Sequence, residues 1–219
     1  MNATDSTHFA IAIDGPAASG KSTVAKRLAQ RLGLVMVNSG AMYRAVTWKV
    51  LSEHIDPQDS AAVTQLLQRI RIECGHDGIS STITIDGIDP GEELRSEKVN
   101  ANVSAISAIP EVRAALIGLQ RGYTRHSNVV MEGRDIGSVV FPDTPYKIYI
   151  DAAEEIRAAR RKAAGEVDSI ASRDAADSSR QTAPLVVAPG ATLLDTSDLS
   201  IDGAVDAAIE ILRHQGLKA

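Results

Sequence analysis

The segment "AIAIDGPAASGKSTVAKRL", residues 10–28, decides the fold of this chain. It begins with an apolar run, which is typical of a buried strand, and a glycine-rich loop follows directly. Val24 and Leu28 then recur at helical spacing, and Gly33 marks the expected end of that helix. A second apolar run, "LVMV" at 34–37, predicts another buried strand. Strand, glycine loop, helix and strand in this order indicate a βαβ unit.

The glycine loop itself, "GPAASGKS" at 15–22, fits the P-loop pattern G-x-x-x-x-G-K-[ST]. Glycines let the backbone turn tightly, so that successive N–H groups point inward and form an anion-binding nest. The start of the following helix adds partial positive charge. Lys21 is expected to reach the β- and γ-phosphates, and the Ser22 hydroxyl is expected to ligate Mg²⁺. The predicted triphosphate-binding residues are Gly15, Pro16, Ala17, Ala18, Ser19, Gly20, Lys21, Ser22 and Thr23.

The composition limits what else the chain can be. Its 219 residues suit one α/β unit that carries an inserted subdomain. The net charge of −5 argues against a general nucleic-acid-binding surface, which needs a basic domain. The single cysteine excludes a disulfide framework. No apolar run approaches the ~18 residues of a membrane span, and residues 1–9 do not resemble a signal peptide, so we expect a cytoplasmic protein without a membrane partner.

Patterns along the rest of the chain extend the βαβ unit into a larger, mostly parallel sheet. Apolar runs predict three more strands, at 128–132, 146–151 and 191–197. A last helix is expected at 201–215. Residues 39–69 look helical, with a break. Residues 70–90 instead alternate apolar and polar residues between turn-rich segments, which predicts a small antiparallel insertion. Residues 165–181 are polar and nearly free of large apolar side chains, so they predict a flap or an exposed connection.

The P-loop does not identify the reaction, because kinases, switch GTPases and motor ATPases share it. A GTPase should carry an N-K-x-D guanine motif, and a motor should be longer, with an apolar strand that ends in paired acids; the sequence shows neither pattern. Arginines favour a kinase, since five fall in predicted loops or helix ends at the carboxyl edge of the sheet: Arg44, Arg113, Arg134, Arg173 and Arg180. Each taken singly has a solvated surface charge as its alternative, but together they suit two phosphorylated substrates.

Four longer motifs carry a family resemblance: "NSGAMYR" (38–44), "PEVRAALIGLQR" (110–121), "EGRDIGSVVFPDTPYKIYIDA" (132–152) and "RDAADSSRQTAPL" (173–185). From about residue 8 to 212 the chain resembles bacterial cytidylate kinase. The resemblance implies that ATP, carried with Mg²⁺, phosphorylates CMP to CDP, with dCMP as a good alternative acceptor. It also implies a cytoplasmic enzyme of pyrimidine nucleotide metabolism, and we expect a monomer.

The resemblance implies a division of the chain as well as an activity. The expected fold class is α/β: a P-loop kinase core with a mostly parallel sheet flanked by helices, an inserted NMP-binding subdomain with a small antiparallel sheet, and a short flap, or lid. The expected boundaries are 8–38, 107–164 and 182–215 for the core, 39–106 for the insertion and 165–181 for the lid.

Site residues follow from the resemblance position by position. Ser39, Arg44 and Arg134 resemble contacts to the acceptor or its phosphate; Ser104, Arg113 and Asp135 resemble the groups that bind cytosine; and Asp177 resembles a contact to a ribose hydroxyl. Arg173 and Arg180 resemble lid arginines that close on the phosphates, and Arg160 resembles an arginine near the donor. The implied catalytic residues are Lys21, Arg134, Arg173 and Arg180.

Some readings stay open at this point. Asn38 stands where the family usually has an aspartate, and Ala176 and Ser178 stand where some relatives have arginines. The neighbours Arg134 and Asp135 could instead form a salt bridge that fixes their loop. The alternatives to a cytidylate kinase are another small-molecule P-loop kinase, such as a shikimate kinase or a different nucleoside monophosphate kinase, and a catalytically silent nucleotide-binding module.

Overall fold

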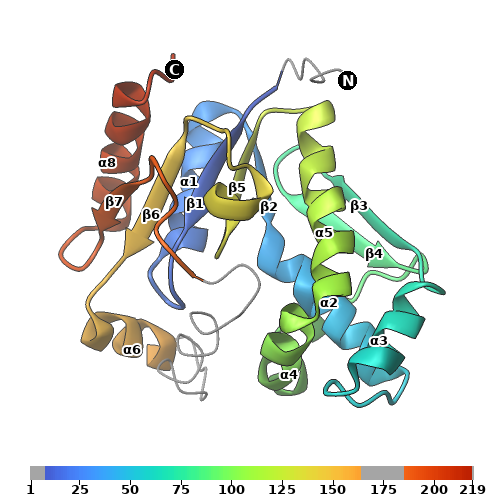
Figure 1. Ribbon diagram of the computed structural model, residues 1–219. Helices are drawn as coiled ribbons and strands as arrows, with labels where there is room; N and C mark the ends of the chain where they lie inside the picture. The colour runs from blue at the N-terminus through green and yellow to red at the C-terminus, as the bar shows by residue number, and fades with distance from the viewer. Residues whose placement is uncertain (1–7, 164–184, 219) are drawn as a thin grey trace.

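Five parallel strands in the order β2-β5-β1-β6-β7 form the central sheet of the computed structural model (Figure 1). The strands are β1 (Ala10–Asp14), β2 (Val35–Asn38), β5 (Val129–Gly133), β6 (Lys147–Asp151) and β7 (Thr192–Asp195). The structure describes residues 8–163 and 185–218. The mostly parallel sheet predicted from the sequence is therefore confirmed, and because all five strands run the same way, their carboxyl ends meet along one edge.

The central strand β1 explains how the sheet is covered on both faces. Successive side chains of a strand point to opposite faces. Ile11 and Ile13 are fully buried against α1 (Lys21–Leu32) and α8 (Ile201–His214) on one face. Ala10 and Ala12 face the opposite side, where Tyr123 and the turn after β5 pack. The predicted strand–loop–helix–strand unit is present as β1, the P-loop, α1 and β2.

The predicted insertion has its own apolar cluster beside the sheet, on the right in Figure 1. Its elements are α2 (Ser39–Ser52), α3 (Ser60–Leu67), the antiparallel pair β3 (Ile72–His76) and β4 (Ser81–Ile85), the 3-10 helix Gly91–Arg95, and α4 (Glu97–Ala108). The antiparallel hairpin predicted for residues 70–90 is confirmed. Buried side chains such as Met42, Val46 and Ile85 fill this cluster.

Helix α5 (Pro110–Gly122) connects the insertion to the sheet. It starts at Pro110, because proline suits the first helical position. Val112 and Leu116 are fully buried in the cluster of the insertion, so α5 packs on both parts of the molecule. The domain boundary near residue 107 accordingly stays a prediction.

Three shorter elements complete the described chain: the 3-10 turn Tyr123–Arg125, the π-helical turn Ile136–Val140 and α6 (Glu154–Ala163). The π-helical turn directly follows the Arg134-Asp135 pair. The predicted lid, 165–181, lies outside the described residues.

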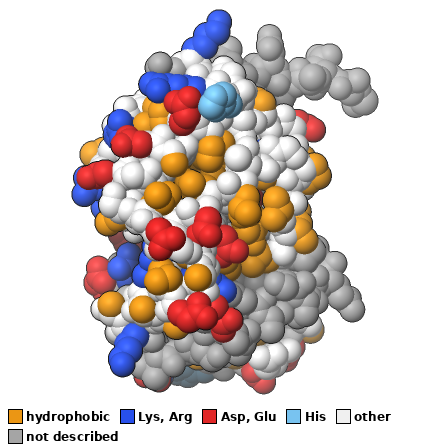
Figure 2. All heavy atoms as spheres, turned by 90° about the vertical axis from the view of Figure 1, so that its left-hand side faces the viewer, with side chains coloured by type: hydrophobic (Ala, Val, Ile, Leu, Met, Phe, Trp, Pro, Cys, Tyr) orange, Lys and Arg blue, Asp and Glu red, His pale blue; other side chains and the backbone are white. Residues whose placement is uncertain are grey.

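Figure 2 shows the side of the molecule formed by α8 and the edge strand β7, where basic, acidic and apolar side chains are interspersed. Between residues 8 and 163 and between 185 and 218, no single helix is both long and apolar enough to cross a bilayer. Taken together, α4 and residues 110–125 would be long and apolar enough by length and composition alone, but the two segments are bent by 95° relative to each other.

Candidate active site

A cavity of about 910 Å³ opens at the carboxyl edge of the sheet. Ligands of parallel α/β sheets bind at this edge, because the loops that follow the strands converge there. The P-loop and the turn after β5 line it from the sheet, α2 and α4 line it from the insertion, and α6 and the start of α8 complete it. The predicted site residues that it brings together are Ala17, Ala18, Gly20, Lys21, Ser22, Thr23, Ser39, Arg44, Ser104, Arg113, Arg134, Asp135 and Arg160.

The other predicted site residues are placed differently. Gly15, Pro16 and Ser19 are buried in the P-loop and do not line the cavity. The three predicted residues Arg173, Asp177 and Arg180 lie outside the described residues.

The P-loop has the backbone geometry that its glycines predict. Gly15 has φ +153°, and a Cβ there would lie 2.0 Å from the carbonyl oxygen of Ile150. Gly20 has φ +90° and precedes α1 directly. Lys21 is 6% exposed, and its Nζ donates to the Pro16 carbonyl at 3.0 Å across the loop. The loop therefore turns tightly around the position where an anion binds in such nests.

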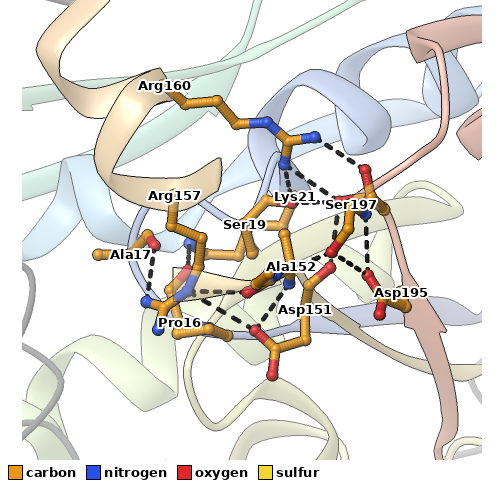
Figure 3. Close-up of polar contacts among 12 residues, drawn as sticks. Pro16, Ala17, Ser19, Lys21, Asp151, Ala152, Arg157, Arg160, Asp195 and Ser197 are labelled. Carbon is orange, nitrogen blue, oxygen red and sulfur yellow. Dashed lines mark hydrogen bonds and ion pairs between the residues drawn. The ribbon is translucent and has the colours of Figure 1, made fainter. Parts of the chain in front are cut away.

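Two arginines of α6 donate hydrogen bonds to backbone carbonyls of the P-loop (Figure 3). Arg157 donates to the Ala17 carbonyl at 3.3 Å, and Arg160 donates to the Ser19 carbonyl at 3.2 Å. Arg160 also donates to the Thr196 carbonyl at 2.8 Å, and Thr196 Oγ1 lies 2.9 Å from the Ser19 carbonyl. The loop is thus braced against α6 and the residues after β7. No motif predicted Arg157 or Thr196 for this role, because their contacts with the loop join segments that are far apart in the chain.

Glu132 is a functional candidate that sequence reasoning missed. It is 4% exposed, and its carboxylate accepts from the Ser22 hydroxyl at 3.0 Å. Its signal in the sequence is a single acid at the carboxyl end of the apolar run "NVVM", whereas the motor-ATPase pattern considered above has a pair of acids there. Hard oxygen donors of this kind fit Mg²⁺, which keeps waters and phosphate oxygens as its remaining ligands. Within the described residues, no cluster of three or more His, Cys, Asp or Glu side chains could hold a metal.

Arg113 and Asp135 form a buried ion pair on the opposite wall of the cavity. Arg113 also donates to the Ser107 carbonyl at 3.2 Å, and its guanidinium carbon lies 5.5 Å from the centre of the Tyr43 ring. Its Nε is buried without a hydrogen-bond partner among the described residues. Buried polar groups are normally hydrogen-bonded, so this N–H is a candidate donor to a ligand in the cavity. Asp135 thus has an ion pair with Arg113, whatever its relation to its neighbour Arg134.

Helix α2 brings the remaining acceptor-side residues to the cavity. Arg44 lies in its second turn rather than at a helix end, and Nε of Arg44 is 3.4 Å from Oδ1 of Asn100 on α4. The Ser39 hydroxyl donates to the Glu132 carbonyl at 2.7 Å. Asn38 caps the helix by accepting from the Ala41 N–H at 2.9 Å. Asparagine caps as well as aspartate, so the departure from the family pattern keeps the helix start and removes only a charge.

Asp14, the last residue of β1, is a third buried acid at this edge, after Glu132 and Asp135. Its side chain accepts from the N–H groups of Ile136 and Gly137, at 2.8 and 2.7 Å. Burial raises its pKa from the ordinary value of 3.8 to about 6, although the two N–H bonds oppose that rise. The nearby charge of Asp135 raises the pKa further, and Arg134 lowers it.

Comparisons with known proteins agree with this geometry. The sequence model of the family described as "Cytidylate kinase" matches residues 11–214. A cytidylate kinase of Streptomyces avermitilis is 40% identical over 216 residues, which cover 94% of this chain and 93% of that protein. One from Caldanaerobacter subterraneus subsp. tengcongensis is 42% identical over 93% of this chain and 94% of its own. A third, from Mycolicibacterium paratuberculosis, is 41% identical over 96% of this chain and 97% of its own.

A comparison of folds adds an architectural match. The crystal structure of TT1252 from Thermus thermophilus superposes with a TM-score of 0.51 over 96% of this chain and 99% of that one. The two sequences are 16% identical, so this match supports the α/β architecture and nothing finer.

Proposed function

This chain belongs to the cytidylate kinase family and catalyses the ATP-dependent phosphorylation of CMP, and we propose that its central cavity aligns the two nucleotides for direct, in-line transfer of the γ-phosphoryl group. One observation carries the proposal: a single cavity has the P-loop on one wall and the Arg113–Asp135 pair on the opposite wall. Donor and acceptor sites that share one cavity need no covalent intermediate on the protein. The membership also leaves a shikimate-type kinase or a silent nucleotide-binding module without support.

The donor phosphates would lie in the P-loop. Inward N–H groups and the start of α1 supply partial positive charge, and Lys21 supplies a full one. Phosphoryl transfer depends chiefly on positioning and on cancelling charge at the moving group. Lys21 is therefore assigned the largest share of that cancellation on the donor side, and Arg160 is assigned to the donor site beside the loop.

Mg²⁺ would enter the site with ATP. We assign the Ser22 hydroxyl as a direct ligand and the Glu132 carboxylate as the group that orients the waters of the ion. When bound, the ion supplies electrostatic stabilisation of the transferring phosphoryl group. The Ser22 hydroxyl donates to Glu132, and that hydrogen bond keeps the two groups side by side, where both could act on the ion.

The acceptor needs cations rather than a general base. A phosphate monoester has a second pKa of about 6, so the CMP phosphate is largely a dianion at pH 7 and can attack without losing a proton. Its approach to ATP is opposed by charge repulsion. We assign Ser39, Arg44 and Arg134 to the acceptor phosphate, together with Arg173 and Arg180 from the predicted lid.

Base choice is assigned to the buried pair. Cytosine offers an amine at its 4-position beside an acceptor nitrogen, and uracil offers a carbonyl and an N–H in the same places. A carboxylate can accept about four hydrogen bonds, so Asp135 can bind Arg113 and the cytosine amine together. Arg113 and Ser104 would donate to the acceptors of the base, and Asp177 would bind the ribose.

The decisive test is a nucleotide panel. ADP formation is measured with ATP, Mg²⁺ and each of CMP, dCMP, UMP, AMP and GMP as acceptor. We expect CMP and dCMP to be the best acceptors and UMP a poorer one. Equal turnover of AMP or GMP would overturn the assignment of base choice to Asp135. A monomeric state and a cytoplasmic location stay predictions, and light scattering at working concentration tests the first.

A further inference from the structure

Asp14 is buried behind the cavity, where it joins the strand that leads into the P-loop to the turn after β5. Its backbone ends β1, where its Cα pairs with Gly133 on one side and with Tyr149 on the other. The next residue, Gly15, begins the P-loop. The side chain of Asp14 points away from the P-loop. Its two oxygens accept from the N–H groups of Ile136 and Gly137, the first two residues of the turn that directly follows Arg134 and Asp135.

We propose that Asp14 is a positioning residue for the acceptor: its carboxylate sets the height and angle at which Arg134 and Asp135 face CMP. The proposal rests on the proposed function, which assigns those two residues to the acceptor. Asp14 itself is 3% exposed and does not line the cavity, so it acts through its neighbours and makes no contact with substrate.

The geometry explains why this position needs two equivalent oxygens. The N–H groups of Ile136 and Gly137 are both at the start of a π-helical turn, and neither has a carbonyl of the preceding residues to bind. A carboxylate satisfies both at once through two charge-assisted bonds, which are shorter and stronger than neutral ones. Fixing these two residues fixes the orientation of Asp135, which immediately precedes them.

Gly137 makes the close approach possible. A Cβ on Gly137 would lie 3.3 Å from an Asp14 oxygen and 3.2 Å from Cδ of Lys147. Contacts this tight would push the turn away from β1 by a few tenths of an ångström. The same contact can therefore be disturbed from either side, at Asp14 or at Gly137.

Loss of this contact should weaken the binding of CMP and leave the binding of ATP nearly unchanged. The start of the P-loop is held independently, by strand pairing of β1 with β5 and β6 and by the packing of Gly15 on the Ile150 carbonyl. In Asp14→Asn, one oxygen is replaced by an NH₂ group that faces an N–H donor. We expect the Kd and KM of CMP to rise about tenfold to a hundredfold, the scale of a lost hydrogen bond to a charged group. The Kd of ATP should change by less than about twofold, because its loop keeps its own supports.

Two further variants keep the test decisive. Gly137→Ala disturbs the same contact without a substitution in β1, and it should raise the Kd of CMP in the same selective way. It serves in place of Asp14→Asn if that protein does not fold. Thr144→Val is the matched control, because it removes the 2.6 Å hydrogen bond from Thr144 to the Ala10 carbonyl at the other end of β1. It should lower stability and leave both nucleotide affinities unchanged.

Hydrogen exchange supplies a readout apart from activity. In both contact variants, the amides of residues 136 and 137 should exchange faster than in the parent protein. Faster exchange with unchanged CMP affinity would overturn the proposal, and so would equal losses of CMP and ATP affinity. The proposed base-reading role fails by a different result, an unchanged CMP/UMP preference when Asp135 itself is altered, so the two ideas are separable.

Discussion

Arg113 and Asp135 form an ion pair whose side chains are 2% and 7% exposed, and it joins α5 to the loop after β5. Removing one partner of a buried pair leaves an uncompensated charge, at a cost of about 3–5 kcal/mol. The pair therefore couples folding to base recognition, because the same two groups that line the cavity also hold its wall together.

Asp135→Asn tests base choice with the least damage to this wall. An amide both accepts and donates, so it can bind the uracil carbonyl that a carboxylate repels. We expect kcat/KM for CMP to fall about tenfold to a hundredfold, with a smaller loss for UMP, so that the preference narrows. Steady-state kinetics with both acceptors measure the ratio. Asp143→Asn, at an exposed position of the same segment, is the control and should leave the ratio unchanged. Equal losses for both acceptors would assign Asp135 to structure alone.

Lys21→Met tests the donor side. Loss of a preorganised charge at the transferring group should lower phosphoryl transfer by at least ~10³-fold in a folded protein. Lys26→Met is the matched control, since Lys26 lies on the same helix but is exposed. Rates of ADP formation and thermal unfolding curves are measured for both proteins. Near-normal turnover of the Lys21 variant would remove the P-loop lysine from the mechanism.

Glu132→Gln tests the metal assignment. The substitution keeps the shape of a buried side chain and removes its charge, so we expect a higher Mg²⁺ concentration for half-maximal rate and a kcat lower by roughly 10²-fold. Ser22→Ala should raise the Mg²⁺ requirement in the same direction. Glu111→Gln, an exposed substitution in the first turn of α5, supplies the control. If the Mg²⁺ dependence of Glu132→Gln matches that of the parent, the carboxylate serves only as an acceptor for Ser22.

The raised pKa of Asp14 predicts a pH dependence of stability. Below its ordinary pKa of 3.8, the carboxyl is protonated in both the folded and the unfolded chain. As the pH rises toward the folded-state pKa of about 6, the unfolded chain ionises first, so this group's contribution to stability is lost over that window. The total loss is on the order of 3 kcal/mol.

Comparison with Asp14→Asn isolates this contribution, because every other titrating group is common to both proteins. Urea unfolding at pH 4 and pH 7 gives the free energy of unfolding of each. The parent should lose stability relative to the variant between these two values. A difference that stays constant would mean that Asp14 keeps its ordinary pKa in the folded state.

The sequence predicted the elements well because their signals are local. Spacing of Val24 and Leu28 identifies α1, and alternation identifies the β3–β4 hairpin. The strand order was beyond prediction, because it depends on which strands pair across long stretches of chain. The P-loop could be located for the same local reason, since the motif is contiguous.

The unpredicted parts of the site are contacts between distant segments. Asp135 pairs with Arg113, 22 residues earlier in the chain. Asp14 binds a turn that begins 122 residues later. Glu132 carried a local signal, an acid at a strand end, but its meaning depends on Ser22 lying beside it in the folded sheet. Sequence spacing alone cannot supply such proximity.

The packing of Gly15 has a consequence for how this chain tolerates variation. A side chain there would collide with the backbone of β6, and no second substitution can relieve that collision, because every residue has the same backbone atoms. In a library that samples every residue at each position, position 15 should therefore yield glycine alone among active clones, whatever the genetic background. Gly118 and Gly122 of α5 have open space where a Cβ would be, and they should accept alanine freely. Sequencing such a library before and after selection would distinguish positions where a backbone contact requires glycine from positions where other residues are tolerated.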